Sequence, residues 1–537
     1  MSRSNTIRIW LLEIDLGHLY LFASEPAVVV SESGVSYVYE AGLSDPGATL
    51  AQGSSADEAS VGLEVLSEVD WALLAAQGIP LEARRATLRR WESGTTLERA
   101  RVILRGRLSE VTYGRAGEVL TARLTRSISR ESDVLPHPQA VIDASTWPIT
   151  GGYAIPERSR GVAYPVVIGA PGHTASGNPL PAVPLVYAQY GASSGLSYLA
   201  LCDGLIDAGT VRLYNFEPST PTSADATVTQ VVDELGRTVS VLTAASLAEE
   251  GRWFAGFADR AGYGGGIVHQ GRLVRGAGDL WRWVFEEHVD TAMDWGRFEA
   301  IRPSLNTYKI DTVINSETNV WDWFTGEVLP LLPIEIRESS RGLYPALMRW
   351  GATSRDAVAH LDGTSGTGRV SRVSAVGSTG EIRNEITIQY RPTGESGNRW
   401  ANRRVATSVA RRTAIEPATV DDDRIRGSRL LTDSQLTYGV LPLTIEAACV
   451  SDDGTADLVL RDRIRAHAWP RRTVSYEGGP WLESLGVGDV VTLADPDLHI
   501  ESLTPAVALV LDVVPGAGSV QVDLMLLDHP LQISRST

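Results

Sequence analysis

Lysine is almost absent from this chain, and its scarcity excludes one large class of proteins. Among 48 basic residues, Lys309 is the single lysine, and no glycine run precedes it. A Walker A loop needs a lysine after its glycines because that ammonium binds the nucleotide phosphates. A P-loop site is therefore excluded. The arginine bias indicates a GC-rich coding genome, with an incidental benefit at interfaces, where a guanidinium pairs two oxygens at once.

Cysteine is equally scarce, with Cys202 and Cys449 far apart and both in apolar surroundings. A disulfide framework or a structural zinc site needs more ligands at closer spacing. An iron–sulfur cluster held by four thiolates is excluded for a single chain. We therefore expect two buried free thiols, no metal site and no cofactor.

Long apolar runs are also missing. The longest, 27–30 and 507–514, have the length of strands, whereas a membrane-spanning helix needs about 18 apolar residues or more. The first ten residues lack the apolar core and cleavage site of a secretory signal. We expect a protein that is made and first used inside a cell, without stable membrane insertion.

Positive charge is in deficit, since 48 basic against 65 acidic residues give a net charge of −17. A general nucleic-acid-binding surface is therefore not expected. A local basic patch stays open as an alternative to arginines on solvated strand faces or in salt bridges, which we favour. The arginines in question are paired at 84–85, 89–90, 403–404 and 411–412.

A length of 537 residues predicts three to five domains, because a domain averages roughly 100–200 residues. The patterns predict a mainly β, multidomain protein of barrels with a few packing helices. We expect five segments: an N-terminal β-barrel with one short helix (1–131), a Gly/Pro-rich β insertion (132–270), a helix–helix–hairpin central unit (271–353), a polar β segment with mobile loops (354–435), and a C-terminal helix with a small barrel (436–537).

The N-terminal and insertion segments are predicted from strand alternation and turn residues. A helix over 69–77 lies between strands at 56–66 and 81–91, and strands 101–113 and 118–124 form a hairpin. These elements predict a closed barrel. In the insertion, strands 227–231 and 237–242 form a second hairpin.

The central unit has the spacing of packed helices. Asp279 is a candidate N-cap for a helix over about 280–294, and Ser316 for a second helix at 320–324. Pro330 and Pro333 forbid its continuation. Residues 334–337 and 343–350 then alternate as two strands of a hairpin. We expect this unit to serve packing, not catalysis.

The last hundred residues contain the clearest periodicity. A cap at 451–454 begins a helix whose Ala456, Leu460 and Ile464 share one face, and Trp469-Pro470 ends it. Residues 507–513 and 520–526 alternate as two antiparallel strands. The sequence therefore predicts a helix that leads into a small barrel.

Three stretches of the central unit resemble tail-tip (baseplate hub) proteins of tailed bacteriophages: GDLWRWVF at 278–285, NVWDWF at 319–324 and LPIEIRESSRGLY at 332–344. The C-terminal helix and barrel resemble the final domain of the same tail hub and tip-attachment family. The resemblance covers somewhat under half of the chain. It implies tail-tube-like barrels, a homotrimeric ring around a channel, and a place in the virion.

Several motifs carry possible chemistry, but none justifies a catalytic, cofactor or metal assignment. Gly191–Gly195 matches the G-x-S-x-G elbow with Ser193, yet the surrounding chain is β-rich with few βαβ units, and so short a match often arises by chance. Glu286 and Glu287 point about 100° apart on a helix, so they do not face one site with His288. Gly262–Gly266 is expected to be a loop, and Asp421–Asp423 a solvated or salt-bridged turn.

The sequence thus predicts a non-enzymatic structural hub at the distal end of a phage tail, assembled in the host cytoplasm. Its expected partners are itself, the distal tail ring, the central tip or fibre and the tape measure, and phage DNA would pass without specific binding. Two alternatives remain open. One is a receptor- or carbohydrate-binding tail protein that uses Trp281, Trp283, Trp321 and Trp323, and the other is a hydrolase that uses Ser193.

Overall fold

The computed structural model describes residues 8–527 except 17, 26–27, 33–34, 45–59, 80, 83, 94, 98–99, 115–116, 126–133, 144–146, 148–154, 173–179, 192–194, 205, 208–209, 216–221, 234, 246, 248–251, 259–264, 290–292, 340–341, 364–367, 374–378, 394–399, 413–424, 499, 501–503 and 516–518. The fold is mainly β, as predicted. Two compact units are present: Met1–Arg130 with Phe285–Ala300 and Ile336–Pro345, and the remaining residues. The five-segment division stays a prediction.

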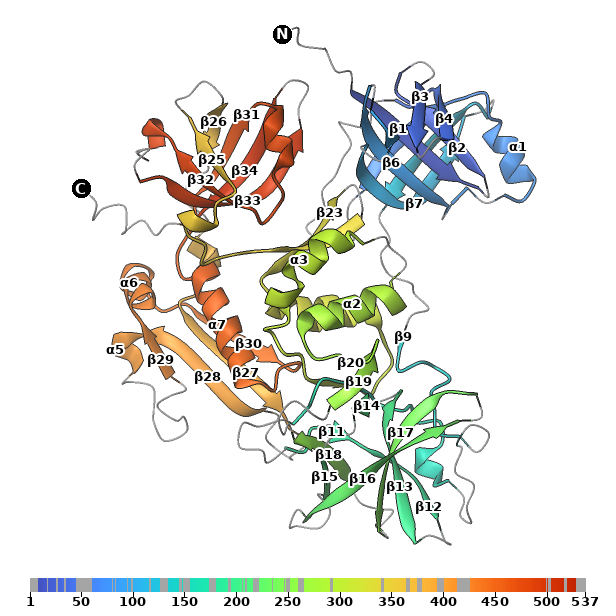
Figure 1. Cartoon of the computed structure of the whole chain (residues 1–537), viewed down its shortest axis with the longest axis vertical. Helices are drawn as coiled ribbons and strands as arrows, with labels where there is room; N and C mark the ends of the chain where they lie inside the picture. Colours follow the sequence, from blue (N-terminus) through green and yellow to red (C-terminus); the bar gives the residue numbers. More distant parts are fainter. Residues whose placement is uncertain are drawn as a thin grey trace. The chain divides into compact units, whose positions relative to one another are not determined.

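The first unit is built on an eight-stranded sheet with the order β3-β4-β2-β1-β6-β7-β8-β5, drawn in blue in Figure 1. The predicted hairpin is β7–β8, and the strands alternate between buried and exposed positions because successive side chains point to opposite faces. The bounds are Arg8–Asp15 (β1), Leu19–Ala23 (β2), Val28–Glu32 (β3), Val35–Ala41 (β4), Ser60–Leu66 (β5), Arg85–Glu92 (β6), Arg101–Tyr113 (β7) and Val119–Thr125 (β8).

One bent segment nearly closes this sheet into the predicted barrel. Strand β4 pairs with β2, and immediately after it the backbone N–H groups of Gly42 and Leu43 donate to the carbonyl of Ala23, both at 3.1 Å. On the other side, Ser44 N–H donates to Glu64 O at 2.9 Å and Leu66 N–H to Gly42 O at 2.8 Å. Residues 42–44 therefore form backbone hydrogen bonds both to β2 and to β5, the last strand on the other side of the sheet.

The barrel core explains the one helix of this region. Helix α1 (Trp71–Ala76) is capped by Asp70, whose carboxylate accepts from Leu73 N–H at 2.9 Å, and the predicted helix at 69–77 is confirmed. Trp71 is fully buried and packs with Phe22 among the inward-facing strand residues. Burial of such a side chain contributes roughly 2–3 kcal/mol.

The second unit contains a seven-stranded sheet with the order β11-β18-β15-β16-β17-β13-β12. Its two edge strands, β11 and β12, follow each other in the chain and are joined through Leu185. One continuous segment therefore provides both edges of this sheet. The predicted hairpin is β16–β17. The bounds are Val183–Pro184 (β11), Val186–Gly191 (β12), Leu196–Asp203 (β13), Thr210–Asn215 (β15), Thr222–Val232 (β16), Thr238–Ala245 (β17) and Trp253–Ala258 (β18).

Shorter strands connect the insertion to the central segment. Two-stranded sheets pair β10 with β21, β9 with β22 and β23 with β24, and a three-stranded sheet has the order β14-β19-β20. The bounds are Val134–Leu135 (β9), Val166–Ile168 (β10), Ile206–Asp207 (β14), Gly265–His269 (β19), Arg272–Leu273 (β20), Thr312–Ile314 (β21), Thr318–Asn319 (β22), Ile334–Ser339 (β23) and Gly342–Leu347 (β24).

The central helices differ from the prediction in number and in their caps. Helix α2 spans Ala277–Glu287, so Asp279 lies in its first turn and is not the N-cap. The Asp279 N–H donates to the side chain of Asn306 at 3.0 Å. The chain ends α2 early and starts a further helix, α3 (Trp295–Leu305), whose Arg297 N–H donates to Asp294 at 3.1 Å.

The second predicted cap, Ser316, is also wrong. Asn319 caps helix α4 (Val320–Trp323), since its side-chain oxygen accepts from Trp321 N–H at 2.9 Å and Asp322 N–H at 3.2 Å. The helix continues as one π turn (Phe324–Val328) and a 3₁₀ turn (Leu329–Leu331), and then the chain becomes extended at Leu332. Pro330 lies inside the 3₁₀ turn, so the prediction that it forbids continuation of the helix is wrong, and the helical run ends before Pro333.

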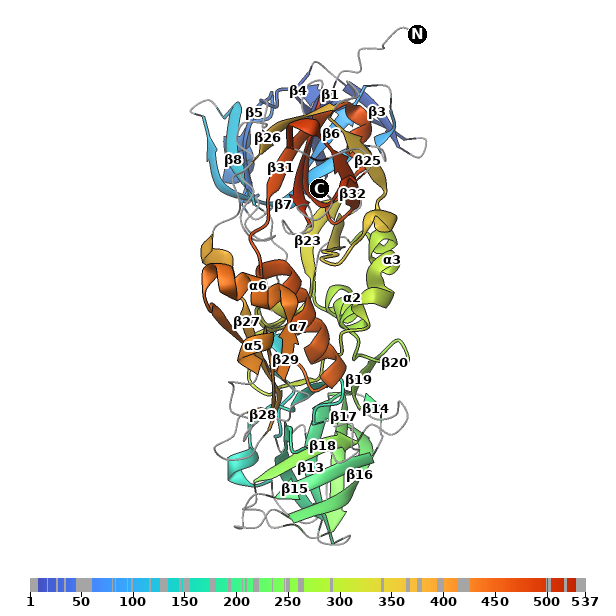
Figure 2. The ribbon, with the colours of Figure 1, turned by 90° about the vertical axis from the view of Figure 1, so that its left-hand side faces the viewer.

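An α/β module follows, with a four-stranded sheet in the order β29-β28-β27-β30. Helix α7 packs on β27 and β28, as Figure 2 shows. The cap of α7 is Asp452, within the predicted 451–454. The bounds are Glu385–Pro392 (β27), Trp400–Ser408 (β28), Val409–Arg412 (α5), Ile425–Ser428 (β29), Arg429–Tyr438 (α6), Pro442–Ala447 (β30) and Asp453–His467 (α7).

The C-terminal sheet has the order β25-β32-β33-β34-β31-β26. The predicted antiparallel pair is β33–β34, and the edge strands β25 and β26 come from the polar stretch that precedes the α/β module. The edges are again consecutive in the chain. The bounds are Ala359–Asp362 (β25), Gly368–Val373 (β26), Thr473–Gly478 (β31), Val490–Ala494 (β32), Ala506–Pro515 (β33) and Val520–Leu526 (β34).

Candidate functional site

The tryptophans of the central segment are core residues. Their exposed fractions are 0% for Trp281, 9% for Trp283, 3% for Trp321 and 8% for Trp323. Trp281 meets Phe324 edge to face, with ring centroids 5.4 Å apart. Sugar stacking needs an exposed ring face, so the carbohydrate-binding alternative is wrong for these four side chains.

The other sequence motifs do not come together as a reactive site. Glu286 and Glu287 are exposed at the end of α2, and His288 is half-buried beyond it. Across the part of the chain that the structure describes, no group of three His, Cys, Asp or Glu side chains is arranged to hold a metal ion. Ser193, the acidic run 421–423 and the loop residues 364–367 lie outside the described residues.

Three of the eight paired arginines, Arg89, Arg404 and Arg411, form ion pairs. Arg89 donates to Glu13 at 2.8 Å, and the same carboxylate accepts from the Tyr39 hydroxyl at 2.7 Å. Arg411 donates to Glu385 at 2.7 Å, and Arg404 pairs with Asp457. These contacts support the salt-bridge interpretation of the pairs over a basic nucleic-acid patch.

Both cysteines are buried and free, as predicted. Burial raises the pKa of Cys202 to about 12 and that of Cys449 to about 12. The thiolate is the reactive form of cysteine, so neither thiol is suited to nucleophilic chemistry at neutral pH.

The first unit carries exposed apolar side chains at several places, including Leu19 on β2 and Leu73 on α1, each 52% exposed. On β4, Val35 is 54% exposed and Val38 is 56% exposed. Leu66 and Tyr113 are also exposed. They lie on either side of the start of β8, where Leu66 pairs with Val119 and Tyr113 pairs with Leu120. Val35 and Val38 are three residues apart on β4, so their side chains point to opposite faces of that strand.

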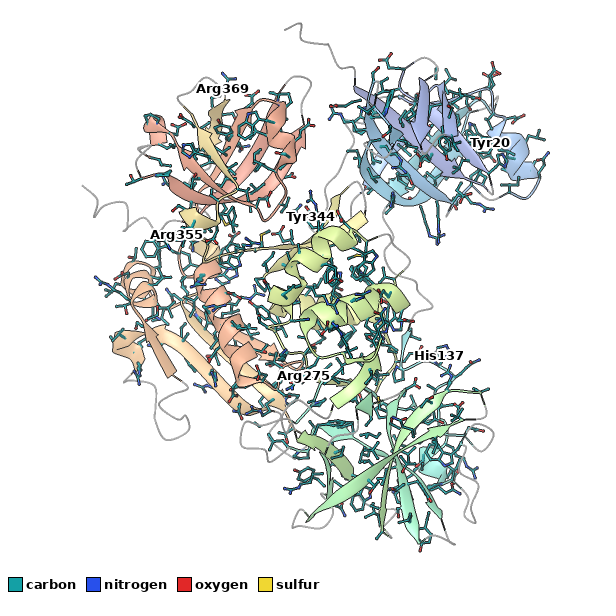
Figure 3. All side chains as sticks on the ribbon, viewed as in Figure 1. Tyr20, His137, Arg275, Tyr344, Arg355 and Arg369 are labelled. Atoms are coloured by element: carbon teal, nitrogen blue, oxygen red, sulfur yellow. The ribbon has the colours of Figure 1, made fainter. Side chains whose placement is uncertain are left out.

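The second unit contains one buried ionic network and one that is partly exposed at Asp453. Asp311 is fully buried and accepts from Ala170 N–H at 2.7 Å and from Arg275 Nε at 2.8 Å; Figure 3 labels Arg275. At the start of α7, Asp453 accepts from the Tyr390 hydroxyl at 2.8 Å and from Arg391 at 3.0 Å. Burial raises the pKa of Tyr390, which keeps its hydroxyl a donor.

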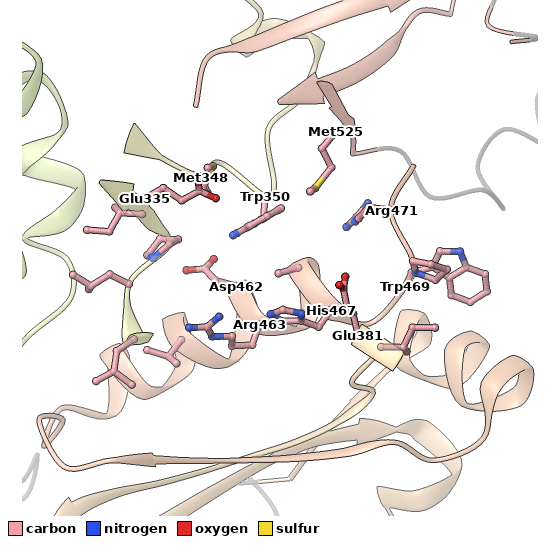
Figure 4. A pocket seen from close by; sticks show the side chains of 18 of the residues that line it. Glu335, Met348, Trp350, Glu381, Asp462, Arg463, His467, Trp469, Arg471 and Met525 are labelled. Carbon is pink, nitrogen blue, oxygen red and sulfur yellow. The ribbon is translucent and has the colours of Figure 1, made fainter. Parts of the chain in front are cut away.

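The fixed helix α7 forms one wall of a pocket of about 340 Å³, shown in Figure 4. The other walls come from the chain after the 3₁₀ turn, from Met348 and Trp350, and from the start of β31 and the end of β34. The lining residues are Leu331, Leu332, Pro333, Ile334, Glu335, Met348, Trp350, Glu381, Ile382, Val459, Asp462, Arg463, Ala466, His467, Trp469, Pro470, Arg471, Thr473 and Met525.

The polar side chains Arg463 and His467 lie one helical turn apart on the α7 wall of the pocket, which Glu335, Glu381 and Asp462 also line. Arg463 donates to the carbonyl of Pro330, and burial lowers the pKa of its guanidinium. Burial, and then the charges of Arg463 and Arg383, lower the pKa of His467, whereas Glu381 acts in the opposite direction. No sequence motif marks this pocket, because its walls are far apart in the chain.

Comparison with solved structures gives several weak similarities, three of which are to phage or virus-like proteins. The chain is similar to one chain in the virion of the native gene transfer agent particle. The two share 15% sequence identity, the match covers 52% of this chain and 85% of that chain, and the TM-score is 0.19. It is similar to the prophage MuSo2 43 kDa tail protein from Shewanella oneidensis, with 9% identity, coverage of 96% of this chain and 98% of that chain, and a TM-score of 0.31. It is also similar to a tail protein from Neisseria meningitidis MC58, with 11% identity, coverage of 67% of this chain and 96% of that chain, and a TM-score of 0.25.

These identities and TM-scores are too low to establish a family or a function for this chain. No protein-family model and no curated protein sequence matches it. Within the described residues, no helix is long and apolar enough to cross a membrane. The functional assignment therefore depends on the surfaces and segments of the chain itself.

Proposed function

We propose that this protein is a structural hub at the distal end of a bacteriophage tail and that it forms a homotrimeric ring. The ring joins the tail tube to the central tip or fibre and to the surrounding tail proteins, and it lines the channel through which DNA leaves. The protein acts mechanically and through its interfaces, without catalysis, and is incorporated into the virion after assembly in the host cytoplasm.

The observation that carries this proposal is the combination of a nearly closed barrel with exposed apolar residues on its surface. A closed sheet resists uncontrolled pairing at its edges, whereas Val35 and Val38 expose one apolar side chain on each face of the β3–β4 hairpin. Strand β3 ends the strand order and pairs with β4 alone in the described sheet. This hairpin is suited to a contact between protomers.

The net charge supports passage of DNA without binding. At −17, the chain repels phosphates unless arginines gather locally. The proposal expects acidic side chains to dominate the channel surface of the ring. A basic channel in an imaged particle would contradict this part of the proposal.

The mass of the purified protein in solution, measured by light scattering over a concentration series, tests the assembly. We expect three times the chain mass for the native protein, and a lower mass for the double variant Val35→Asp, Val38→Asp. Val232→Asp is the matched control, because Val232 is equally exposed, at 60%, on a different sheet. A native monomer at all concentrations, or a loss of mass with the control alone, would count against the ring.

A further inference from the structure

The segment that follows strand β9 contacts two parts of the second unit that are distant from each other in the chain. On one side, Leu135 of β9 pairs with Thr318 of β22. On the other, the imidazole Nδ1 of His137 lies 2.7 Å from a guanidinium nitrogen of Arg237, in the turn between β16 and β17; Figure 3 labels His137. The backbone N–H of Gln139 lies 3.2 Å from the same ring nitrogen. One imidazole therefore joins the segment 134–139 to this turn.

Both groups that meet Nδ1 of His137 are donors. The guanidinium of Arg237 has no acceptor atom, and the backbone N–H of Gln139 can only donate. Nδ1 is therefore the acceptor of both hydrogen bonds, which requires a neutral imidazole with its proton on Nε2. An imidazolium carries N–H at both nitrogens, so it would direct a donor at two donors and set a second positive charge beside Arg237. The contact thus exists in one charge state of this ring and not in the other.

The turn that carries Arg237 has hydrogen bonds of its own that do not depend on the histidine. Asp233 is 4% exposed, and its Oδ1 accepts from the backbone N–H groups of Leu235 at 2.9 Å and Arg237 at 2.8 Å. The N–H of Asp233 donates to the carbonyl of Arg237 at 2.8 Å, and that of Gly236 donates to the carbonyl of Asp233 at 2.9 Å. Loss of the His137 contact would therefore release the turn as a unit, together with the side chain of Leu235, which is 53% exposed.

Carboxylates with unused hydrogen-bonding capacity lie in the same cluster. Oδ2 of Asp233 is buried and has no hydrogen-bond partner among the described residues. Asp203, at the end of β13, forms hydrogen bonds to described residues through its backbone N–H and carbonyl but not through its carboxylate. Burial raises the pKa of Asp203, whereas the charges of Arg237 and His137 lower it. An imidazolium and a displaced guanidinium would therefore each have a carboxylate nearby.

We propose that His137 is a pH-sensitive latch that fastens the turn 233–237 to the segment 134–139. At neutral pH the ring accepts from Arg237 and the latch is closed. Histidine takes up a proton between about pH 8 and pH 5, and protonation of His137 breaks both hydrogen bonds to Nδ1 and opens the latch. Arg237 then turns to Asp233, and the turn moves independently of β9. The latch does not depend on whether the protein forms a ring.

The charged groups around His137 act in opposite directions on its protonation. Arg237 disfavours the imidazolium through its charge, whereas Asp203 and Asp233 favour it. Glu317, which is exposed and directly precedes β22, also favours it. The carboxylates therefore stabilise the protonated ring, while the closed contact with Arg237 excludes it. Proton uptake and opening are linked for this reason.

Hydrogen–deuterium exchange of the full chain at pH 7.5 and pH 5.5, read by mass spectrometry, tests the latch. Labelling times are scaled so that intrinsic amide exchange is equal at the two pH values. We expect peptides that cover 136–142 to exchange about fivefold faster at pH 5.5, the factor that corresponds to the loss of one hydrogen bond. Peptides of β13 and β17 should not change. Equal exchange of 136–142 at the two pH values would overturn the proposal.

Two variants separate the charge of His137 from its structural role. His137→Asn puts an amide oxygen close to the position of Nδ1 and does not titrate, so exchange of 136–142 should be slow and equal at both pH values. Arg237→Met keeps the aliphatic part of the side chain but has no donor, so exchange should be fast at both. A pH response that persists in His137→Asn, or slow exchange in Arg237→Met at pH 7.5, would contradict the latch.

His360→Asn is the matched control. His360 is also exposed, but its Nδ1 lies 2.9 Å from the hydroxyl of Thr492. A hydroxyl can donate or accept, so protonation of that ring does not break the contact. This variant should keep the native pH response in 136–142, and loss of the response would contradict the assignment to His137. Far-UV circular dichroism and the unfolding midpoint verify that each variant folds.

Discussion

In the first barrel and in the C-terminal sheet, different groups complete the link between the two sides of the sheet. In the first barrel, backbone hydrogen bonds on both sides of Gly42 complete it. In the C-terminal sheet, a side chain does so: the Tyr476 hydroxyl donates to the carbonyl of Asp362, at the end of β25, at 3.2 Å. Gly368, the first residue of β26, lies against the same tyrosine.

This difference teaches how much each closure depends on one residue. Gly42 has a φ of +140°, a region that residues with a side chain rarely adopt, and an added Cβ would overlap the carbonyl oxygen of Leu66. At Gly368 the atoms nearest to an added Cβ belong to the ring and hydroxyl of Tyr476. Backbone cannot yield without loss of the sheet, whereas a side chain can shift.

Gly42→Ala is expected to have the largest effect. The forbidden backbone conformation and the overlap with Leu66 together should cost about 3 kcal/mol or more. Amide hydrogen exchange of the full chain, resolved by peptide, measures this as faster exchange in 42–44 and 60–66. Gly78→Ala is the control, because Gly78 has a φ of +80° with no atom within 4 Å of an added Cβ. An equal effect in both variants would mean that the overlap contributes nothing.

Gly368→Ala is expected to destabilise the C-terminal sheet less, by about 1–3 kcal/mol, as overpacking of a buried contact does. Faster exchange should appear in β26 and β31, with β4 and β5 unchanged. Exchange that also rises in the first barrel would show that the two closures are coupled.

Tyr476→Phe is expected to cost about 1 kcal/mol, the net value of one hydrogen bond. It removes the donor to Asp362 and leaves the buried ring. The double variant Gly368→Ala, Tyr476→Phe should lose less stability than the sum of the losses in the two single variants. The reason is that removal of the Tyr476 hydroxyl relieves part of the overlap with the added methyl group. Full additivity would show that the hydroxyl is not what the added methyl group meets.

Val35→Asp and Val38→Asp are expected to have the smallest effect on stability, within about 0.5 kcal/mol, because surface substitutions seldom exceed this. Unfolding midpoints measure it. Their effect on the mass in solution should be large all the same. The surface of the barrel would then be separable from its closure, and a joint loss of stability and assembly would contradict that separation.

Local sequence patterns predicted the elements whose stability is local. The alternation of 507–513 and 520–526 predicted β33 and β34, and the acidic stretch at 451–454 predicted the cap of α7. The cap at Asn319 was missed, although Asn is as good a cap as Ser. Its hydrogen bonds depend on where β22 ends, and two residues of alternation do not show that.

The sequence by itself determined a mainly β chain with buried free cysteines, no P-loop and a strongly acidic charge. Tertiary structure alone decided that 359–373 completes the C-terminal sheet and that residues from 331 to 525 meet in one pocket. The physical reason is that alternation records which face of a strand is buried, whereas pairing partners and cavity walls depend on contacts between segments distant in the chain.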